Sequence, residues 1–350
     1  MMVQPHNRQR TSANGRSQPI SRRQFVAAGG AATVAGVAGC LGGGGSDDGR
    51  EEVNIVLTPA EAEVDIEDQW APFFDLIEQE ADVRVNVDVA ANFAAVAAAI
   101  RDGHADIGDV SPEVGIYTAE QGYADILGTR SQDGSDRYFT FITTTPEYEI
   151  ESLEDIGNHD DPTIGFADPL SGTGSLVPLL MLEEAGFDIG DAPLGQPEDF
   201  AAEWSDHSTA RETLLNRQGV VAAGTGEFSV MPHLPEDEIP EEVAEISGDY
   251  QFVASESTDL RLVAASDPLP RAPLTIRSDW DSPVAETVEE VILNATEDDL
   301  VDEDSEVPLW FDGVNEATVD DYSEFRDAIE ALGIDLIDDI DEAEDTESPE

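Results

Sequence analysis

The segment that most constrains this chain is a β-branched run that leads through a loop of small residues into an apolar helix. The run Thr163–Phe166 predicts a strand, the loop spans residues 168–178, and the helix is expected over residues 176–185. A loop of Gly, Ser and Thr at a helix start gathers free backbone N–H groups and hydroxyls around one point, where an anion is stabilised. A plain capped turn explains the same residues, because Ser and Thr are common N-caps. The local pattern leaves both interpretations open.

Strands alternate with helices along most of the chain after residue 52. The predicted strands are residues 53–57, 83–89, 105–110, 138–144, 163–166, 261–265 and 274–276. The predicted helices are residues 66–79, 93–101, a helix that starts at Ser111 and Pro112, and residues 152–156, 176–185, 284–293 and 322–332. This order indicates an α/β protein with a mostly parallel sheet, in which ligands bind at the carboxyl ends of the strands.

The beginning of the chain carries an export signature. Arg22 and Arg23 precede a short, weakly apolar run that ends at Cys40, and this run is too short to span a bilayer. The residues before Cys40 resemble a lipobox. We therefore predict a twin-arginine lipoprotein signal over residues 1–39, then a lipidated Cys40 and a flexible tether over residues 40–51. An uncleaved anchor and simple cleavage after the run are the alternatives.

The composition describes the environment of the protein more than its partner. The chain has 78 acidic and 16 basic residues, all of the latter arginines, and its formal charge is −62. Five arginines precede Cys40, so the remainder carries 11 − 78 = −67. Such a charge excludes nucleic acid as a partner. It is typical of a halophile surface, because molar salt shortens the screening length to about 3 Å. The single cysteine excludes an intrachain disulfide and a Cys-based zinc site.

Seven short segments, taken in order, resemble the phosphate/phosphite/phosphonate-binding family, the solute receptors of ABC importers. The resemblance runs from about residue 53 to residue 335, which is nearly all of the chain after the tether. The matching segments are residues 57–59, 91–107, 133–138, 150–156, 168–178, 205–219 and 267–270.

This resemblance implies an α/β, two-lobed periplasmic-binding-protein fold of type II, with two hinge strands and a ligand cleft between the lobes. Residues 52–142 would form the first part of lobe 1, and residues 143–265 would form lobe 2. Residues 266–335 would return to lobe 1 and add the C-terminal helices. Residues 336–350 are rich in Asp and Glu and predict a disordered acidic tail.

The same resemblance implies a solute-binding protein and not an enzyme. Such a protein captures phosphonate, phosphite or phosphate-type oxyanions by closure of the cleft and delivers them to a permease and its ATPase, without a cofactor or metal ion. With the leader and the composition, the expectation is a haloarchaeal-type lipoprotein that acts as a monomer. It would be anchored by Cys40 to the outer face of the cell membrane.

The family's oxyanion loop falls on Ser171, Gly172 and Thr173, whose hydroxyls and amides would bind the ligand beside Gly174. The family's cleft histidine falls on His207, which would donate to a ligand oxygen. Without the resemblance, a surface histidine that caps a helix at Ser208 is the alternative interpretation of His207.

The other end of the implied site differs from the family pattern. Aromatic cover falls on Tyr138 and Phe93, although either ring could be core packing. One of two carboxylates that hold an ammonium group in some members falls on Glu227. The other position falls on Ala272, next to Arg271, which could pair with an anion. These differences favour phosphate, phosphite or a simple alkylphosphonate over an aminoalkylphosphonate.

Other functions stay open at this point. A related receptor for another small anion, a sulfonate or a thiamine precursor would share the fold. Ser171, His207 and Asp168 could nominally form the triad of an exported hydrolase, but the serine lacks a G-x-S-x-G elbow. Asn294 begins an Asn-Ala-Thr triplet that could be glycosylated.

Overall fold

A computed structural model describes residues 49–61, 65–254, 259–301, 307, 309–336 and 340. The predicted export signal, Cys40 and most of the tether lie outside these residues. The predicted acidic tail also lies mostly outside them, but Leu336 and Ile340 are described, and both are buried in the apolar core. Within the described residues, no helix combines the length and apolarity that crossing a bilayer requires.

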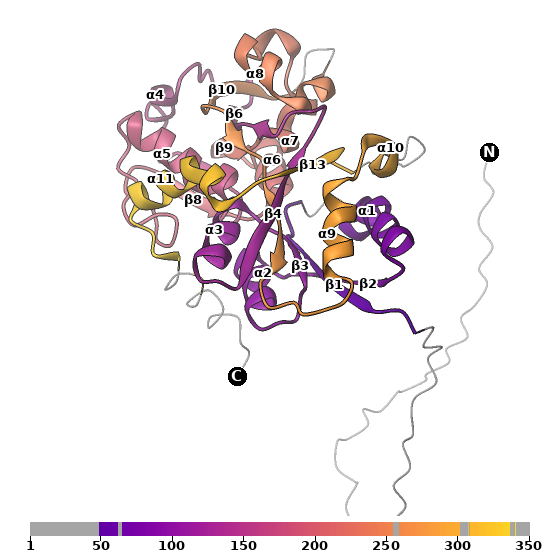
Figure 1. Cartoon of the computed structure of the whole chain (residues 1–350). Coiled ribbons are helices and arrows are strands. Elements are labelled where there is room, and N and C mark those ends of the chain that lie inside the picture. The colour runs from indigo at the N-terminus through magenta and orange to yellow at the C-terminus, as the bar shows by residue number, and fades with distance from the viewer. Residues whose placement is uncertain are drawn as a thin grey trace, which may run out of the picture. The chain divides into compact units, whose positions relative to one another are not determined.

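The first lobe is built on a six-stranded sheet with the order β13-β4-β12-β3-β1-β2. Its strands are β1 (Glu52–Leu57), β2 (Arg84–Val89), β3 (Ile107–Asp109), β4 (Ala124–Ser131), β12 (Pro273–Arg277) and β13 (Gly313–Glu316). β1 pairs in parallel with β2 and β3, whereas β12 runs antiparallel to both β3 and β4. A strand from late in the chain therefore lies in the middle of a sheet formed by early strands (Figure 1).

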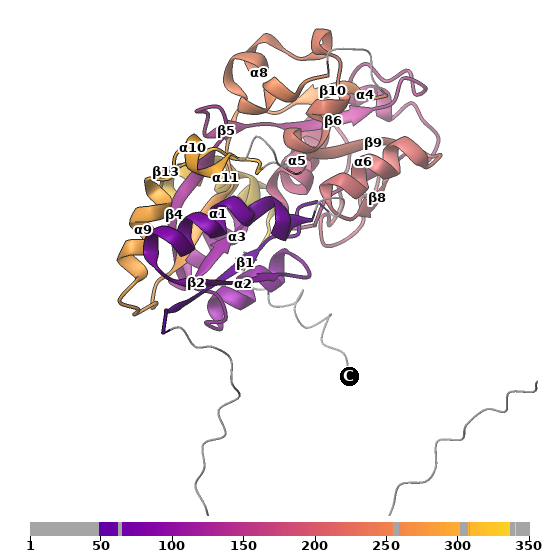
Figure 2. The same cartoon turned by 90° about the vertical axis from the view of Figure 1, so that its right-hand side faces the viewer.

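The second lobe is built on a five-stranded sheet with the order β10-β6-β9-β7-β8. Its strands are β6 (Thr140–Thr144), β7 (Thr163–Phe166), β8 (Ala201–Trp204), β9 (Val220–Gly226) and β10 (Arg261–Ala265). β7 pairs in parallel with β8 and β9, and β6 and β10 close the other edge in antiparallel fashion. Figure 2 shows the strands of the two lobes as separate groups.

Two short strands join the lobes. The chain leaves the first sheet through β5 (Arg137–Tyr138) and returns through β11 (Leu269–Pro270), and these two strands pair with each other in antiparallel fashion. This pair confirms the expectation of two hinge strands. The run predicted as one strand over residues 138–144 is divided at Phe139. The backbone there turns from the hinge pair into the second sheet, and the Phe139 carbonyl accepts from the Glu227 N–H at 3.0 Å.

Helices cover both faces of each sheet. They are α1 (Ile66–Ala81), α2 (Phe93–Arg101), α3 (Pro112–Glu120), α4 (Leu153–Ile156), α5 (Val177–Glu184), α6 (His207–Asn216), α7 (Glu227–Val230), α8 (Glu241–Ile246), α9 (Ala285–Leu293), α10 (Glu297–Leu300) and α11 (Ser323–Leu332). α1 and α9 pack on one face of the first sheet around Trp70 and Phe73, and α2 and α3 pack on the other face. α11 contacts α3 in the first lobe and α5 in the second.

Local sequence signals explain where several helices begin. Asn92 caps α2 by accepting from the Ala95 N–H at 2.8 Å, and Ser111 caps α3 with Pro112 at the first helical position. The helix expected over residues 176–185 begins earlier than predicted, as one wide turn over Gly172–Leu176 that continues into α5.

Gly128 offers a test of the pairing between β4 and β13. A Cβ at this position would lie 2.6 Å from the Asn315 carbonyl oxygen and 2.7 Å from Val314 Cγ1, and neither atom belongs to a flexible chain end. We expect Gly128→Ala to lower the free energy of unfolding by about 1–3 kcal/mol, as measured by urea titration. Gly157→Ala is the control, because its Cβ would meet no atom closer than 3.5 Å. Equal urea midpoints for the two variants would contradict this account of the sheet.

Candidate ligand-binding site

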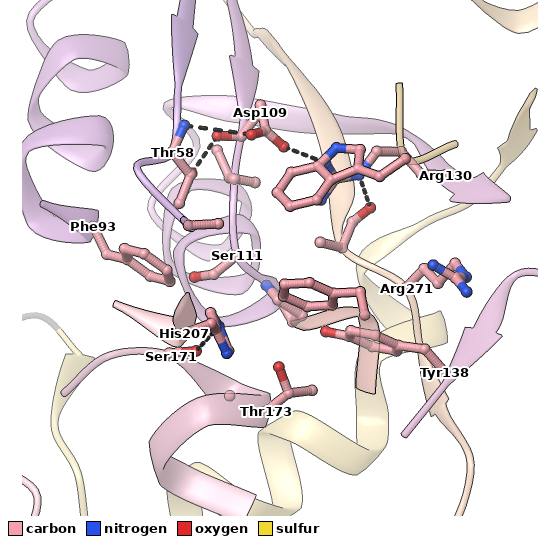
Figure 3. A pocket seen from close by; sticks show the side chains of 17 residues that line it. Thr58, Phe93, Asp109, Ser111, Arg130, Tyr138, Ser171, Thr173, His207 and Arg271 are labelled. Atoms are coloured by element: carbon pink, nitrogen blue, oxygen red, sulfur yellow. Dashed lines mark hydrogen bonds and ion pairs between the residues drawn. The ribbon is translucent and has the colours of Figure 1, made fainter. Parts of the chain in front are cut away.

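A cavity lies between the two lobes, at the carboxyl ends of strands from both sheets. It offers about 60 Å³ to the centres of water-sized groups. Since one water needs about 10–15 Å³ by this measure, there is room for roughly four to six such groups, the size of a tetrahedral oxyanion with a small substituent. The lining residues are Thr58, Ala60, Phe93, Asp109, Val110, Ser111, Pro112, Arg130, Tyr138, Ser171, Gly172, Thr173, His207, Phe228, Arg271, Ala272 and Trp310. Figure 3 shows how these side chains converge.

The loop after β7 forms one wall of the cavity. Ser171 Oγ caps the following helix by accepting from the Gly174 N–H at 3.1 Å, while Gly172 and Thr173 line the cavity. The two glycines are required sterically. A Cβ on Gly172 would lie 2.4 Å from a Phe325 ring carbon, and one on Gly174 would lie 2.2 Å from Ala167 Cβ. The loop can therefore keep its backbone close to a ligand only with glycine at both positions.

His207 fixes the direction of the hydrogen bonds around Ser171. Its Nδ1 accepts from the Gly226 N–H at 3.0 Å, and its Nε2 lies 3.2 Å from Ser171 Oγ. Burial lowers the pKa of His207 to about 4, against a smaller opposite effect of Asp206, so the ring is neutral near pH 7. A neutral ring whose Nδ1 accepts carries its proton on Nε2. Nε2 therefore donates to Ser171 Oγ.

The hydroxyl of Ser171 is thereby left as a donor into the cavity. Its oxygen faces two N–H groups, from Gly174 and from His207, and its own proton must point elsewhere. The same tautomer rules out the role of general base, because Nε2 already holds a proton and cannot take one from Ser171. The arrangement suits an acceptor-rich ligand and does not suit nucleophilic catalysis.

Other donors and helix starts face the same space. Tyr138 is 5% exposed, and burial first, then the charge of Glu113, raises the pKa of its hydroxyl, so that it remains a neutral donor. The N-terminal ends of α2 and α3 add Phe93 and Ser111 to the lining. Their partial positive charges favour an anion at this place.

An ion pair that the sequence interpretation missed forms the wall of the first lobe. Arg130 Nη1 lies 2.8 Å from Asp109 Oδ1, and the guanidinium lies 5.4 Å from the centre of the Trp310 ring. Burial raises the pKa of Asp109 to about 6, although the charge of Arg130 opposes this. One sequence signal could have pointed to Asp109: this residue ends a strand that leads directly into the capped helix α3.

A second group of buried charges lies behind Tyr138. Arg271 Nη2 lies 2.7 Å from Asp249 Oδ2 and 3.8 Å from Glu227 Oε1, and its guanidinium stacks over the Tyr138 ring at 5.6 Å. Ser247 donates to Glu227 Oε1 at 2.5 Å. Burial, and then the nearby charge of Asp249, raise the pKa of Glu227 well above its ordinary value. Burial therefore disfavours a second negative charge beside Asp249 in this group.

The structure brings most of the predicted site residues together around one cavity. Those that line it are Ser171, Gly172, Thr173, His207, Tyr138, Phe93 and Arg271, together with Ala272. Gly174 belongs to the same loop but does not line the cavity, and Glu227 lies behind Arg271 with no exposed surface. The other lining residues, which the sequence did not single out for the site, are Thr58, Ala60, Asp109, Val110, Ser111, Pro112, Arg130, Phe228 and Trp310.

Comparison with known proteins identifies the family. Residues 55–322 match the sequence profile described as "ABC transporter, phosphonate, periplasmic substrate-binding protein". The chain belongs to this family. The family resemblance inferred from the seven sequence segments is therefore confirmed.

Individual relatives are more distant. The phosphonates-binding periplasmic protein of Escherichia coli is 25% identical over 135 residues, a match that spans 38% of this chain and 40% of that protein. The binding protein component of an ABC phosphonate transporter from Pseudomonas aeruginosa superposes with a TM-score of 0.62 at 17% identity, over 81% of this chain and 87% of that one. PhnD1 from Prochlorococcus marinus, in complex with methylphosphonate, gives 0.61 at 13% identity, over 81% and 98%. These two structures confirm the two-lobed fold.

Glu113 in this phosphonate-binding family member lies against the loop from the opposite lobe. It has no exposed surface, and a Cβ on Gly172 would lie 2.0 Å from its Oε1. Burial raises its pKa to about 8, opposed by hydrogen bonds from the backbone and from Ser111, and assisted by the charge of Asp168. The loop thus faces a protonated carboxyl near neutral pH.

The raised pKa of Glu113 should make the free energy of unfolding depend on pH. Its folded pKa of about 8 exceeds the ordinary value of 4.5, so the unfolded chain ionises first. The contribution of Glu113 to the free energy of unfolding should therefore fall as the pH rises from about 4.5 to 8. A glutamine does not ionise, so we expect Glu113→Gln to lack this loss. The free energy of unfolding of Glu113→Gln minus that of wild type should therefore be larger at pH 9 than at pH 5, by on the order of 3 kcal/mol. Urea unfolding at both pH values measures this difference, and Glu154→Gln, at an exposed residue, is the control. A difference that does not depend on pH would refute the assignment.

Proposed function

We propose that this protein is an extracytoplasmic solute-binding protein that captures a small phosphonate-, phosphite- or phosphate-type oxyanion and delivers it to an ABC permease with its ATPase. The observation that carries the proposal is the direction of the donors at the loop. The Ser171 hydroxyl points into a cavity that Gly172 and Thr173 line at a helix start, and the neutral His207 ring holds it there. Family membership supports the same function.

Charge-assisted hydrogen bonds would supply most of the affinity. Each is worth about 1.5–3 kcal/mol, and a helix start adds about 0.3–2 kcal/mol for an anion. The lining carboxylate, Asp109, is paired with Arg130, so that it does not confront the ligand with an uncompensated negative charge.

Closure of the lobes around the ligand follows from the hinge pair of β5 and β11. Trp310 from the first lobe and Phe228 from the second meet at 5.4 Å between ring centres, and Phe228 contacts the His207 ring at 4.9 Å. This contact across the cleft would form as the lobes come together. We further propose that the protein is a monomer, exported by the twin-arginine signal and anchored to the outer face of the membrane through Cys40.

A screen of candidate ligands tests the proposed function. Thermal unfolding of the purified protein in about 3 M salt should show a raised midpoint with phosphite, phosphate or methylphosphonate, because a ligand that binds only the folded state stabilises it. Sulfate and a thiamine precursor are the competing candidates. A shift with one of these alone, or turnover of an ester substrate, would replace the proposal.

The loop itself is tested by removal of two hydroxyls. We expect Ser171→Ala combined with Thr173→Ala to weaken binding of the ligand found in the screen by at least about 100-fold in calorimetry, since two hydrogen bonds to a charged group are lost. Ser171 is also an N-cap, so Ser152→Ala, which removes the cap of α4 away from the cavity, is the matched control. Undiminished affinity in a folded double variant would place the ligand elsewhere.

A further inference from the structure

Two buried carboxyl groups meet one guanidinium at the side of the cavity. Glu227 begins α7, directly after β9, and Asp249 belongs to a later turn of the second lobe, Gly248–Phe252. Glu227 has no exposed surface and Asp249 is 2% exposed. Both approach Arg271, at 3.8 Å and 2.7 Å.

This group has the composition of a cation-binding subsite. Buried carboxylates need a cation or a proton to offset the loss of hydration. Among the ion pairs of the described residues, Arg271 is the one basic partner of either carboxyl. Ser247 adds a hydroxyl, which donates to Glu227 Oε1 and accepts from the Asp249 N–H at 3.0 Å. Arg271 therefore offsets the charge of this group without a ligand.

Arg271 connects this subsite to the ligand cavity. Its side chain lines the cavity, and its main chain is held at the hinge, because its N–H donates to the Asp136 carbonyl at 2.8 Å and its carbonyl accepts from the Tyr322 hydroxyl at 3.0 Å. The guanidinium stacks over Tyr138, another lining residue. A ligand on this side of the cavity would therefore contact the Arg271 guanidinium, which separates it from the carboxyl groups of Glu227 and Asp249.

We propose that Arg271 fills, from within the chain, a cation subsite formed by Glu227 and Asp249, and that it thereby restricts the ligand to small oxyanions without an amino group. This inference rests on the proposed function and specifies its ligand class. An ammonium-bearing ligand finds the subsite occupied and meets the positive charge of Arg271. The other lining carboxylate, Asp109, is already paired with Arg130.

The test compares two ligands of equal shape by calorimetry. 2-Aminoethylphosphonate carries an ammonium group where propylphosphonate carries a methyl group. We expect wild type to bind propylphosphonate more tightly than the amino compound by about tenfold or more. Arg271→Ala opens the subsite, and we expect it to reverse this preference, so that the ratio of the two dissociation constants changes by at least about 100-fold.

Two control variants separate the subsite from general effects. Arg271→Ala combined with Glu227→Gln and Asp249→Asn has a neutral subsite, and it should lose the gain in binding of the amino compound. Arg261→Ala removes an arginine of the second lobe that pairs with Glu238 at 2.9 Å and does not line the cavity, and it should keep the wild-type preference.

Each result decides between the proposals. If wild type binds neither these two ligands nor methylphosphonate, phosphite or phosphate, the proposed function fails, and the inference fails with it. If wild type binds one of them but already prefers the amino compound to propylphosphonate, or if Arg271→Ala leaves the preference unchanged, the inference alone is overturned. Should Arg271→Ala not fold, Arg271→Gln removes the same positive charge, keeps both carboxyl groups and retains a polar side chain, and it is read in the same way.

Discussion

The hydrogen bond from the Gly226 N–H to His207 Nδ1 determines the character of the cavity. A backbone N–H can only donate, so Nδ1 accepts, and the single proton of the neutral ring lies on Nε2. Ser171 Oγ then accepts from two sides, and its hydroxyl proton is directed to the cavity. The Gly226 N–H, at the end of β9, thus fixes both His207 Nε2 and the Ser171 hydroxyl as hydrogen-bond donors. The same bond deprives Ser171 of a base, which explains why a serine 3.2 Å from a histidine is not arranged for catalysis.

Charge compensation in the wall is the second constraint. Asp109 is paired with Arg130 and Asp249 with Arg271. Burial raises the pKa of Glu113 to about 8 and that of Glu227 well above its ordinary value, which disfavours a negative charge on either side chain. An anion in the cavity therefore meets hydroxyls, N–H groups and helix starts in a wall with little net charge. This matters in a chain whose part from Cys40 onward carries −67. In molar salt that charge is screened beyond about 3 Å, and short-range donors decide binding.

The parts of the fold and site that could be predicted are those with local signals. Asn92 and Ser111 mark the starts of α2 and α3, and the loop around Ser171 lies within one strand–turn–helix unit. The pair of Asp109 and Arg130 has no such signal. Asp109 ends β3 and Arg130 lies in β4, and these two strands are joined in one sheet by β12, which begins more than 140 residues later in the chain and pairs with both. The pairing of Arg271 with Asp249 likewise depends on the return of the chain through the hinge.

The position of the hinge pair bears on how recognition and closure are coupled. Tyr138 pairs with Leu269 across β5 and β11, and Arg271 follows directly after β11, so two lining residues belong to the connection about which the lobes would rotate. Because rotation about a hinge displaces the groups at its axis least, contacts made there would change little between an open and a closed arrangement. Trp310 and Phe228 come from different lobes, and their ring contact requires the lobes to be together. On the proposed function, ligand selection by hinge residues and retention by contacts across the cleft would therefore be separable, because they depend on different groups.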